Sequence, residues 1–309
     1  MNSICDFSFN IVLFLSELIV LFVNCTREFI VFTIRRFFPK QKKSIVGEIA
    51  LVTGGGHGIG RELCYQIAIE GAFVVVWDID QLGAEKTVNT IRSRGGKAKY
   101  YLVDVTAYEQ VVSTSNLVRE EIGDVTILVN NAGILHGLDI LNLSEKQIRK
   151  TFDVNSIALF WTIKAFLPRM IELNRGHVIN ICSLAAFSGL AYLSDYGSSK
   201  FAIRGLHTYL EEEIRLHFKR DIKLSSVFPG FTDTGLVKGM HSRFDRILTT
   251  KEVAQVTIED VLRNEQLIYV PRRMRYILGP IGLIPSKIVS LSLDFSGSRI
   301  DLQTDKIGK

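Results

Sequence analysis

Seven short apolar runs separated by helical patterns constrain the fold of this 309-residue chain more than any other feature. The runs are rich in β-branched and aromatic residues, and most are uniformly apolar. That pattern is typical of parallel strands covered on both faces. The runs occupy residues 49–54, 73–78, 98–104, 126–133, 177–183, 223–230 and 267–271. The repeated strand–helix–strand spacing predicts an α/β fold, a Rossmann-type doubly wound parallel sheet in a single domain.

A glycine-rich turn in Leu51–Ala68, LVTGGGHGIGRELCYQIA, joins the first strand to the first helix. Glycine permits the tight turn and lets the backbone approach a pyrophosphate, while the helix N-terminus supplies N–H donors. Such a turn alone is weak evidence, but its position between a strand and a helix strengthens it. The turn predicts a dinucleotide site. The expected cofactor contacts here are Gly54, His57, Gly58, Ile59 and Gly60.

Asp78 ends the second strand, where a dinucleotide-binding fold places the carboxylate that binds the adenine-ribose hydroxyls. Its negative charge would repel a 2′-phosphate, which favours NAD over NADP. Two alternatives stay open at this point. Asp78 could simply cap the following helix, and His57 and Arg61 nearby could tolerate a phosphate.

The stretch Ser183–Lys200, SLAAFSGLAYLSDYGSSK, contains a serine, a tyrosine and a lysine that together suit proton transfer. Tyr196 and Lys200 are one helical turn apart, so both side chains can reach one spot. Free tyrosine has a pKa of about 10, and a nearby ammonium group favours the phenolate. Ser183 would hydrogen-bond the same substrate oxygen. Each residue alone could instead serve the local structure as a turn serine or a helix-surface pair.

With these motifs the chain resembles the short-chain dehydrogenase/reductase family over about residues 46–271. The family's TGxxxGxG motif appears as Thr53–Gly60, its NNAG motif as Asn130–Gly133, and its active-site asparagine as Asn155 in FDVN. The sequence PGFTDTG (229–235) resembles the loop after the sixth strand that touches the nicotinamide end. The resemblance implies that the catalytic residues are Tyr196, Lys200, Ser183 and Asn155, with Ser183 also contacting the substrate.

The resemblance also implies cofactor contacts at the ends of the later strands. In such a site Lys200 binds the ribose hydroxyls, and Asn155 holds a water that links Lys200 to solvent. No metal is expected, because the six histidines show no H-x-x-x-H spacing. The further cofactor contacts implied are Asp104, Val105, Asn131, Ala132, Gly133, Tyr196, Lys200, Pro229, Gly230 and Thr232.

Stretches such as GEIALVTGGGHGIGR, GDVTILVNNAG and GHVINICS are similar to the membrane-associated branch of that family. This branch holds the 17-beta-hydroxysteroid dehydrogenases of types 11 and 13 and epidermal retinal dehydrogenase 2. The resemblance implies an NAD-dependent oxidoreductase for a lipophilic alcohol, ketone or aldehyde, such as a steroid or retinoid. It also implies a homodimer on the endoplasmic reticulum membrane or on lipid droplets. The alternatives are an NADPH-dependent carbonyl reductase and a catalytically silent NAD-binding protein of lipid surfaces.

The N-terminal residues 1–43 predict a retained hydrophobic anchor. The apolar run Phe7–Val23 is interrupted by Asn10, Ser16 and Glu17. Its length is near the lower limit for crossing a bilayer, and Glu17 leaves open whether the segment spans or lies in the interface. Basic residues follow the run, which predicts that the catalytic domain faces the cytosol. They are Arg35, Arg36, Lys40, Lys42 and Lys43.

The dehydrogenase domain is expected at 44–271, followed by an apolar extension and a polar tail at 272–309. The extension could line the substrate entrance and touch the bilayer, or pack on the domain as an apolar tail. The net charge of +5 is concentrated in the basic residues after the anchor, so no nucleic-acid partner is expected. The scattered cysteines indicate free thiols in a reducing compartment.

Overall fold

The computed structural model describes residues 2–38, 40–236, 239–244, 246–279, 281 and 284–303. The chain forms two compact units, residues 1–42 and residues 43–309. The first unit contains α1 (Asn2–Phe37), one continuous helix of 36 residues that includes the polar stretch NCTRE. Within the described residues, no helix combines the length and the apolar character needed to cross a membrane.

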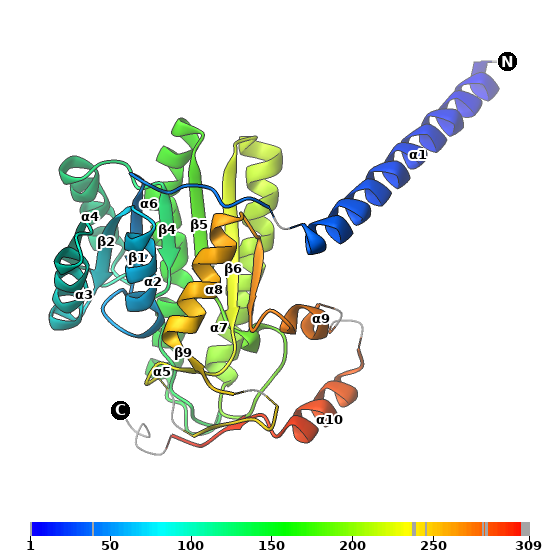
Figure 1. The fold of residues 1–309 in the computed structure, drawn as a ribbon. Coiled ribbons are helices and arrows are strands. Elements are labelled where there is room, and N and C mark those ends of the chain that lie inside the picture. The colour runs from blue at the N-terminus through cyan, green and yellow to red at the C-terminus, as the bar shows by residue number, and fades with distance from the viewer. Residues whose placement is uncertain are drawn as a thin grey trace. The chain divides into compact units, whose positions relative to one another are not determined.

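A seven-stranded parallel sheet forms the centre of the second unit (Figure 1), as the sequence predicts. Its strand order is β10-β6-β5-β4-β1-β2-β3, so the order reverses between β1 and β4. The strands are β1 (Ile49–Thr53), β2 (Phe73–Asp78), β3 (Ala98–Leu102), β4 (Ile127–Asn130), β5 (Gly176–Ile181), β6 (Ile222–Pro229) and β10 (Leu267–Val270).

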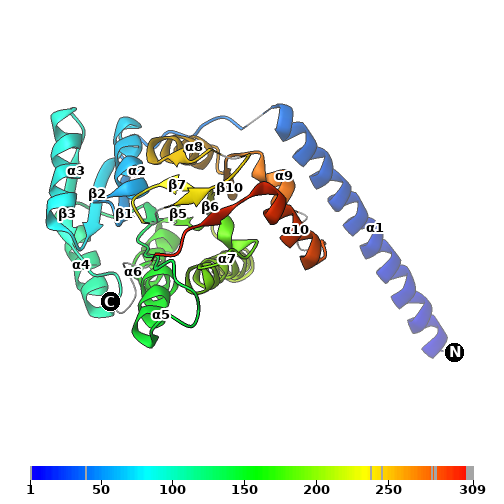
Figure 2. The same ribbon diagram turned by 90° about the horizontal axis from the view of Figure 1, so that it is seen from below.

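Helices cover both faces of the sheet (Figure 2): α2, α3 and α8 lie on one face and α4, α6 and α7 on the other. This arrangement explains the uniformly apolar strands, because successive residues enter different cores. In β2, Val75 and Trp77 pack on the α4, α6 and α7 side, whereas Val74 and Val76 pack on the opposite side. The helices are α2 (Gly58–Ile69), α3 (Gln81–Ser93), α4 (Tyr108–Glu121), α5 (Glu145–Phe152), α6 (Ala158–Leu173), α7 (Ser194–Glu212) and α8 (Thr250–Leu262).

The C-terminal extension folds against the carboxyl ends of the strands. It contains α9 (Met274–Leu278) and α10 (Ser286–Ser296), and it ends in β11 (Arg299–Ile300). β11 pairs with β8 (Met240–His241), and a second small ladder joins β7 (Thr232–Asp233) to β9 (Leu248–Thr249). These two ladders fix the extension and the loop after β6 over the same end of the sheet.

Lys43, which the sequence groups with the basic cluster, is part of the second unit. Its backbone N–H donates to the Leu262 carbonyl oxygen (2.7 Å), and its Nζ lies 2.9 Å from His177 Nδ1. Ser225 donates its hydroxyl hydrogen to the Glu265 carbonyl and so accepts from His177 Nε2, 2.8 Å away. His177 Nδ1 is therefore the acceptor for Lys43. Burial lowers the pKa of Lys43 to about 8 and lowers the pKa of His177 well below its ordinary value.

Candidate active site

A cavity of about 900 Å³ opens at the carboxyl ends of the strands. It lies where the strand order reverses, which is the usual ligand position in open α/β sheets. Every predicted site residue lines this cavity except Gly60 and Asn155. The predicted strands 98–104 and 126–133 run past the observed ends of β3 and β4, because the last residues of each prediction have left the sheet to line the cavity.

Gly60 contributes through close packing under the glycine-rich turn. A Cβ atom at Gly60 would collide with the Gly54 carbonyl oxygen, so only glycine fits. Gly54 itself has a φ of +64°, a left-handed conformation that favours glycine. Asn131, after β4, donates from Nδ2 to the carbonyl oxygens of Thr53 (3.0 Å) and Gly54 (3.1 Å). The turn is therefore fixed against the neighbouring strand in a form that leaves room for a pyrophosphate.

Asp78 is buried at the end of β2, and backbone N–H groups hold both of its carboxylate oxygens. Gly56 donates to Oδ2 (2.7 Å) and Asp80 donates to Oδ1 (2.9 Å). Asp80, and not Asp78, caps α3, since its side chain accepts from the N–H groups of Leu82 and Gly83. The structure thus rules out helix capping as the role of Asp78 and points its carboxylate into the cavity.

Two basic side chains near Asp78 are already engaged. The Arg61 guanidinium donates to the Gly56 carbonyl oxygen and to Thr87 Oγ1. His57 Nε2 lies 2.5 Å from Asp80 Oδ2. This contact is the main reason why the pKa of Asp80 lies below its ordinary value. A 2′-phosphate at this position would therefore meet the Asp78 carboxylate and two basic side chains that already have partners.

Tyr196 and Lys200 lie one turn apart on α7, and Ser183 lies beside them, two residues after the end of β5. Lys200 is buried, its Nζ donates to the Ile181 carbonyl oxygen (3.0 Å), and this Nζ lies 5.4 Å from the centre of the Tyr196 ring. Burial raises the pKa of Tyr196 to about 12, which the Ser183 hydroxyl partly offsets, and burial lowers the pKa of Lys200. In the protein without cofactor, burial therefore dominates the pKa of Tyr196, and the lowering that the sequence predicts from Lys200 is not seen.

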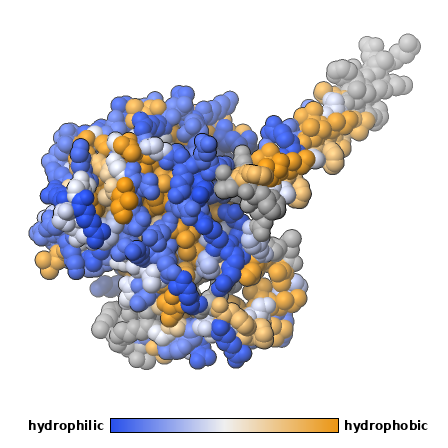
Figure 3. All heavy atoms as spheres, viewed as in Figure 1, coloured by the Kyte–Doolittle hydropathy of each residue, from blue (hydrophilic) through white to orange (hydrophobic). Residues whose placement is uncertain are grey.

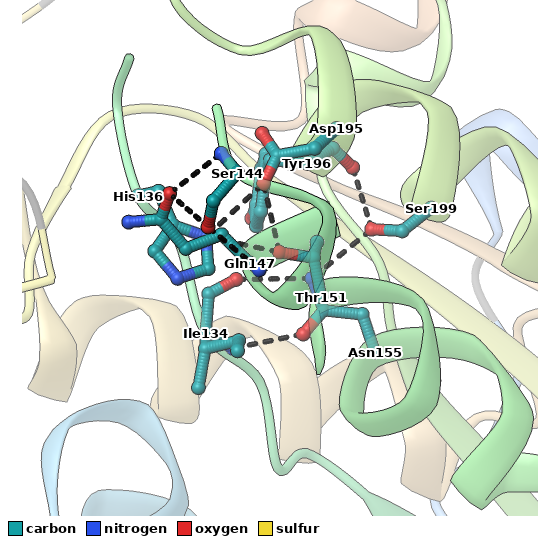
Figure 4. Close-up of polar contacts among 9 residues, drawn as sticks. All are labelled: Ile134, His136, Ser144, Gln147, Thr151, Asn155, Asp195, Tyr196 and Ser199. Atoms are coloured by element: carbon teal, nitrogen blue, oxygen red, sulfur yellow. Dashed lines mark hydrogen bonds and ion pairs between the residues drawn. The ribbon is translucent and has the colours of Figure 1, made fainter. Parts of the chain in front are cut away.

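Asn155 lies behind the cavity, in a π-helical turn (Asp153–Ile157) between α5 and α6. Its Oδ1 accepts from the Ile134 N–H (2.8 Å), while Nδ2 donates to the Ile134 carbonyl oxygen (3.0 Å) and to Ser199 Oγ (3.0 Å). Figure 4 shows these contacts joining the loop after β4 to α7. Irregular π-turns of this kind are frequent at functional sites.

Sequence reasoning missed the polar cluster beside Asn155 in Figure 4, formed by His136, Thr151 and Asp195. No local pattern could have found it, because its members lie on three separate elements. The sequence left open whether the C-terminal extension lines the substrate entrance or packs on the domain as an apolar tail. In the structure, side chains on α9, on α10 and between them line the cavity. Among them are Ile277, Leu278, Ile284, Ile288, Val289 and Leu293.

The residues present fit a nicotinamide dinucleotide: a glycine turn with space for the pyrophosphate, a buried carboxylate for the ribose, and a tyrosine–lysine pair farther along one cavity. Among the described residues, no group of three or more His, Cys, Asp or Glu side chains is arranged to hold a metal ion. This fold and this site define a nicotinamide-dependent oxidoreductase.

Comparison with known proteins narrows that class. Residues 48–243 match the short chain dehydrogenase family. Human 17-beta-hydroxysteroid dehydrogenase 13 is 38% identical over 271 residues, covering 88% of this chain and 90% of that protein. Mouse estradiol 17-beta-dehydrogenase 11 is 37% identical over 258 residues, covering 84% of this chain and 87% of that protein. The chain belongs to the short chain dehydrogenase family and is an oxidoreductase acting on CH–OH groups.

Solved structures agree on the fold. A Burkholderia phymatum short chain dehydrogenase/reductase in complex with NAD superposes with a TM-score of 0.71 at 24% identity, covering 81% of this chain and 96% of that one. A metagenomic short-chain oxidoreductase in complex with NADP gives a TM-score of 0.62 at 28% identity, covering 74% of this chain and 99% of that one.

Proposed function

We propose that the protein is an NAD-dependent dehydrogenase that interconverts a lipophilic alcohol with its ketone or aldehyde, in the class of steroids and related lipids. One observation carries the proposal: Ser183, Tyr196 and Lys200 share a cavity with the glycine turn, and the far wall of that cavity is apolar. A steroid suits this class because two relatives are named hydroxysteroid or estradiol dehydrogenases.

The side chains divide the chemistry of alcohol oxidation. Tyr196 takes the hydroxyl proton, and Ser183 donates a hydrogen bond to the same oxygen as negative charge develops on it. Lys200 supplies a positive charge beside the phenol and would hold the ribose of the bound cofactor, and Asn155 holds the loop and α7 in place. The bound cofactor supplies the hydride acceptor. Because burial keeps the pKa of Tyr196 near 12 in the protein alone, its activation requires additional positive charge in the cavity.

NAD is the preferred cofactor in this proposal. The Asp78 carboxylate is oriented by Gly56 and Asp80 and can accept hydrogen bonds from ribose hydroxyls with its remaining lone pairs. Arg61 and His57 are tied to Gly56 and Asp80, which weakens the alternative of an NADPH-dependent reductase. The complete set of proton-transfer residues argues against the catalytically silent alternative.

The C-terminal extension offers an apolar entrance. α10 has no buried residue, yet one side of it lines the cavity and the other exposes Leu291 and Phe295. Apolar side chains gather over α9 and α10 in Figure 3. An exposed apolar helix at a cavity mouth suits contact with a lipid surface, from which a lipophilic substrate can enter.

We further propose that residues 1–42 attach the enzyme to the endoplasmic reticulum membrane or to lipid droplets, with the domain that begins at Lys43 facing the cytosol. α1 exposes large apolar side chains such as Phe14, Phe22 and Phe29. Figure 3 shows that apolar residues run along this helix. A homodimer is proposed as well, since Phe160 on α6 and Phe201 and Tyr209 on α7 are exposed.

A substrate panel tests the enzymatic proposal. Detergent-solubilised full-length protein is given estradiol, retinol or a long-chain primary alcohol with NAD or NADP, and NADH or NADPH formation is followed. The expected result is oxidation of at least one of these lipids, faster with NAD. Tyr196→Phe protein is the blank. Equal signals from the blank and the wild type with every alcohol would refute the function.

A truncation tests the membrane proposal separately. Protein lacking residues 1–38 is expected to move from the membrane pellet to the soluble fraction and still to bind NAD, because Lys43 and everything after it belong to the second unit. If the truncated protein is folded and still pellets completely with membranes, residues 1–38 are not the attachment site. The apolar surface of α9 and α10 would then be the attachment site to test.

A further inference from the structure

Asp195, the residue immediately before Tyr196, is a buried carboxylate that the reaction described above does not use. Its side chain is 1% exposed. Oδ2 accepts from the Thr151 hydroxyl on α5 (2.7 Å) and lies 3.1 Å from His136 Nδ1, in the loop after β4. Oδ1 is buried and has no hydrogen-bond partner within the described residues. Because one oxygen has no partner, the position and stability of this buried carboxylate depend strongly on the hydrogen bonds to its other oxygen.

The hydrogen positions in this cluster follow from its geometry. A carboxylate only accepts, and the single Thr151 hydroxyl hydrogen is donated to Asp195 Oδ2. His136 Nδ1 lies 3.1 Å from both Thr151 Oγ1 and Asp195 Oδ2, so it faces two acceptors and must carry a hydrogen. His136 therefore donates from a defined nitrogen and holds α5 and α7 together from the loop.

This cluster repeats the Asn155 contact one helical turn away. Thr151 and Asn155 are four residues apart on the α5 side, and Asp195 and Ser199 are four residues apart on α7. The loop supplies a partner to each contact, Ile134 to one and His136 to the other (Figure 4). Tyr196 lies between the two points where α7 is held.

The first turn of α7 has little local support. The residue before the helix, Leu193, offers no side-chain cap for its N–H groups. Neither His136 nor Asp195 lines the cavity, so neither touches the substrate or the cofactor. Their effect on the reaction must pass through the backbone of α7.

We propose that His136 and Asp195 are positioning residues that hold the first turn of α7, and with it the Tyr196 phenol, at its working position; the catalytic consequence rests on the proposed function. Displacement of a reacting group by about 1 Å can cost about 10²-fold in rate. Loss of the His136 contact should therefore lower kcat and leave cofactor binding intact, because the glycine turn and Asp78 lie on other elements.

His136→Phe and His136→Asn test the proposal. Phenylalanine fills the space of the ring but cannot donate, whereas the asparagine amide can place an N–H group where Nδ1 was. We expect His136→Phe to speed hydrogen–deuterium exchange in residues 193–200 by about tenfold or more, with α2 unchanged. For the alcohol oxidised fastest in the panel, kcat should fall about 10- to 100-fold with the Kd for NAD unchanged. His136→Asn should recover most of both losses.

The same substitution at the exposed His217, beyond the end of α7, is the matched control and should change neither readout. If His136→Phe shows the same exchange and the same kcat as the wild type, the proposal is wrong. It is also wrong if kcat falls without faster exchange in residues 193–200. If the wild type oxidises no alcohol of the panel, the substrate proposal fails by itself. Exchange then decides: faster exchange in His136→Phe supports the contact, and unchanged exchange refutes it.

Discussion

The two ends of the cavity are held in different ways. At the cofactor end, hydrogen bonds between side chains and backbone fix the glycine turn, Asp78 and Asn131. At the opposite end, α9 and α10 present aliphatic side chains, and α10 has no buried residue of its own. Directional polar contacts specify one geometry, whereas apolar packing tolerates several shapes.

Each end of the cavity therefore controls a different part of the reaction. Hydride transfer needs the cofactor and Tyr196 at fixed positions; the strand ends position the cofactor, and the hydrogen-bonded start of α7 positions Tyr196. The substrate needs only an apolar space of suitable size, since one methylene group in such a pocket changes discrimination by about 1–3 kcal/mol. The rate of hydride transfer should therefore be sensitive to changes at the strand ends and in α7, and the choice of substrate to changes in α9 and α10.

The largest expected effect comes from Tyr196→Phe. Only the proton carrier is lost, so turnover should fall by about 10³-fold or more while the Kd for NAD stays within about twofold. Single-turnover oxidation and NAD titration by fluorescence measure the two quantities. Turnover within tenfold of the wild type would place the proton transfer elsewhere.

Asp78→Ala should act on cofactor binding and not on proton transfer. Loss of a charged acceptor for the ribose hydroxyls should weaken NAD by about 10- to 100-fold, from about 1.5–3 kcal/mol per hydrogen bond to a charged group. NADP should gain relative to NAD, because the charge that repels a 2′-phosphate is gone. Titration with both cofactors measures this. A wild-type enzyme that already prefers NADP would contradict the role given to Asp78.

Leu293→Ser and Leu291→Ser compare the two sides of α10. Leu293 lines the cavity, so its loss should raise KM for a lipophilic alcohol by about tenfold, with the NAD affinity unchanged. Leu291 is exposed and does not line the cavity, so the same substitution there should leave KM unchanged. Equal effects at both positions would mean that α10 acts through its fold and not through substrate contact.

The smallest effect concerns His177, at the amino end of β5 and away from both ends of the cavity. Burial lowers its pKa, while in the unfolded chain the imidazole takes up a proton near pH 6.5 (about the ordinary value). The unfolded state therefore binds more protons below about pH 6.5, so stability should fall as the pH drops through that value. Buried His207, with a pKa lowered to about 4, contributes in the same direction.

Thermal midpoints at pH values on either side of that window measure this term, with the fall expected to be a few degrees, or about 1 kcal/mol. His177→Gln should reduce the fall, and His217→Gln at an exposed position should leave it unchanged. The Kd for NAD should not differ among the three proteins at neutral pH. A pH dependence that is identical in all three would show that His177 is not the group responsible.

Part of the site could be predicted because its residues are close in sequence or follow a strand directly. Gly54, Gly58 and Gly60 share one turn, Tyr196 and Lys200 share one helix face, and Asp78 ends a strand. Parallel strands bring their carboxyl ends to one edge, so residues that follow them converge even when they are far apart in sequence. The roles of Asp78 and Asp80 could not be assigned from the sequence. The structure shows that Asp80 caps α3, whereas Asp78 lines the cavity.

The sequence alone is enough to predict the doubly wound sheet, the glycine turn, the order of the motifs and the apolar character of the two end segments. Those properties follow from periodicity and from residues within a few positions of one another. Three other features become visible only in the folded protein: Asn155 and Gly60 lie behind the cavity, Lys43 contacts His177, and His136 contacts Asp195. Such contacts join residues 59 to 134 positions apart, and no local pattern encodes which polar groups meet once the helices pack.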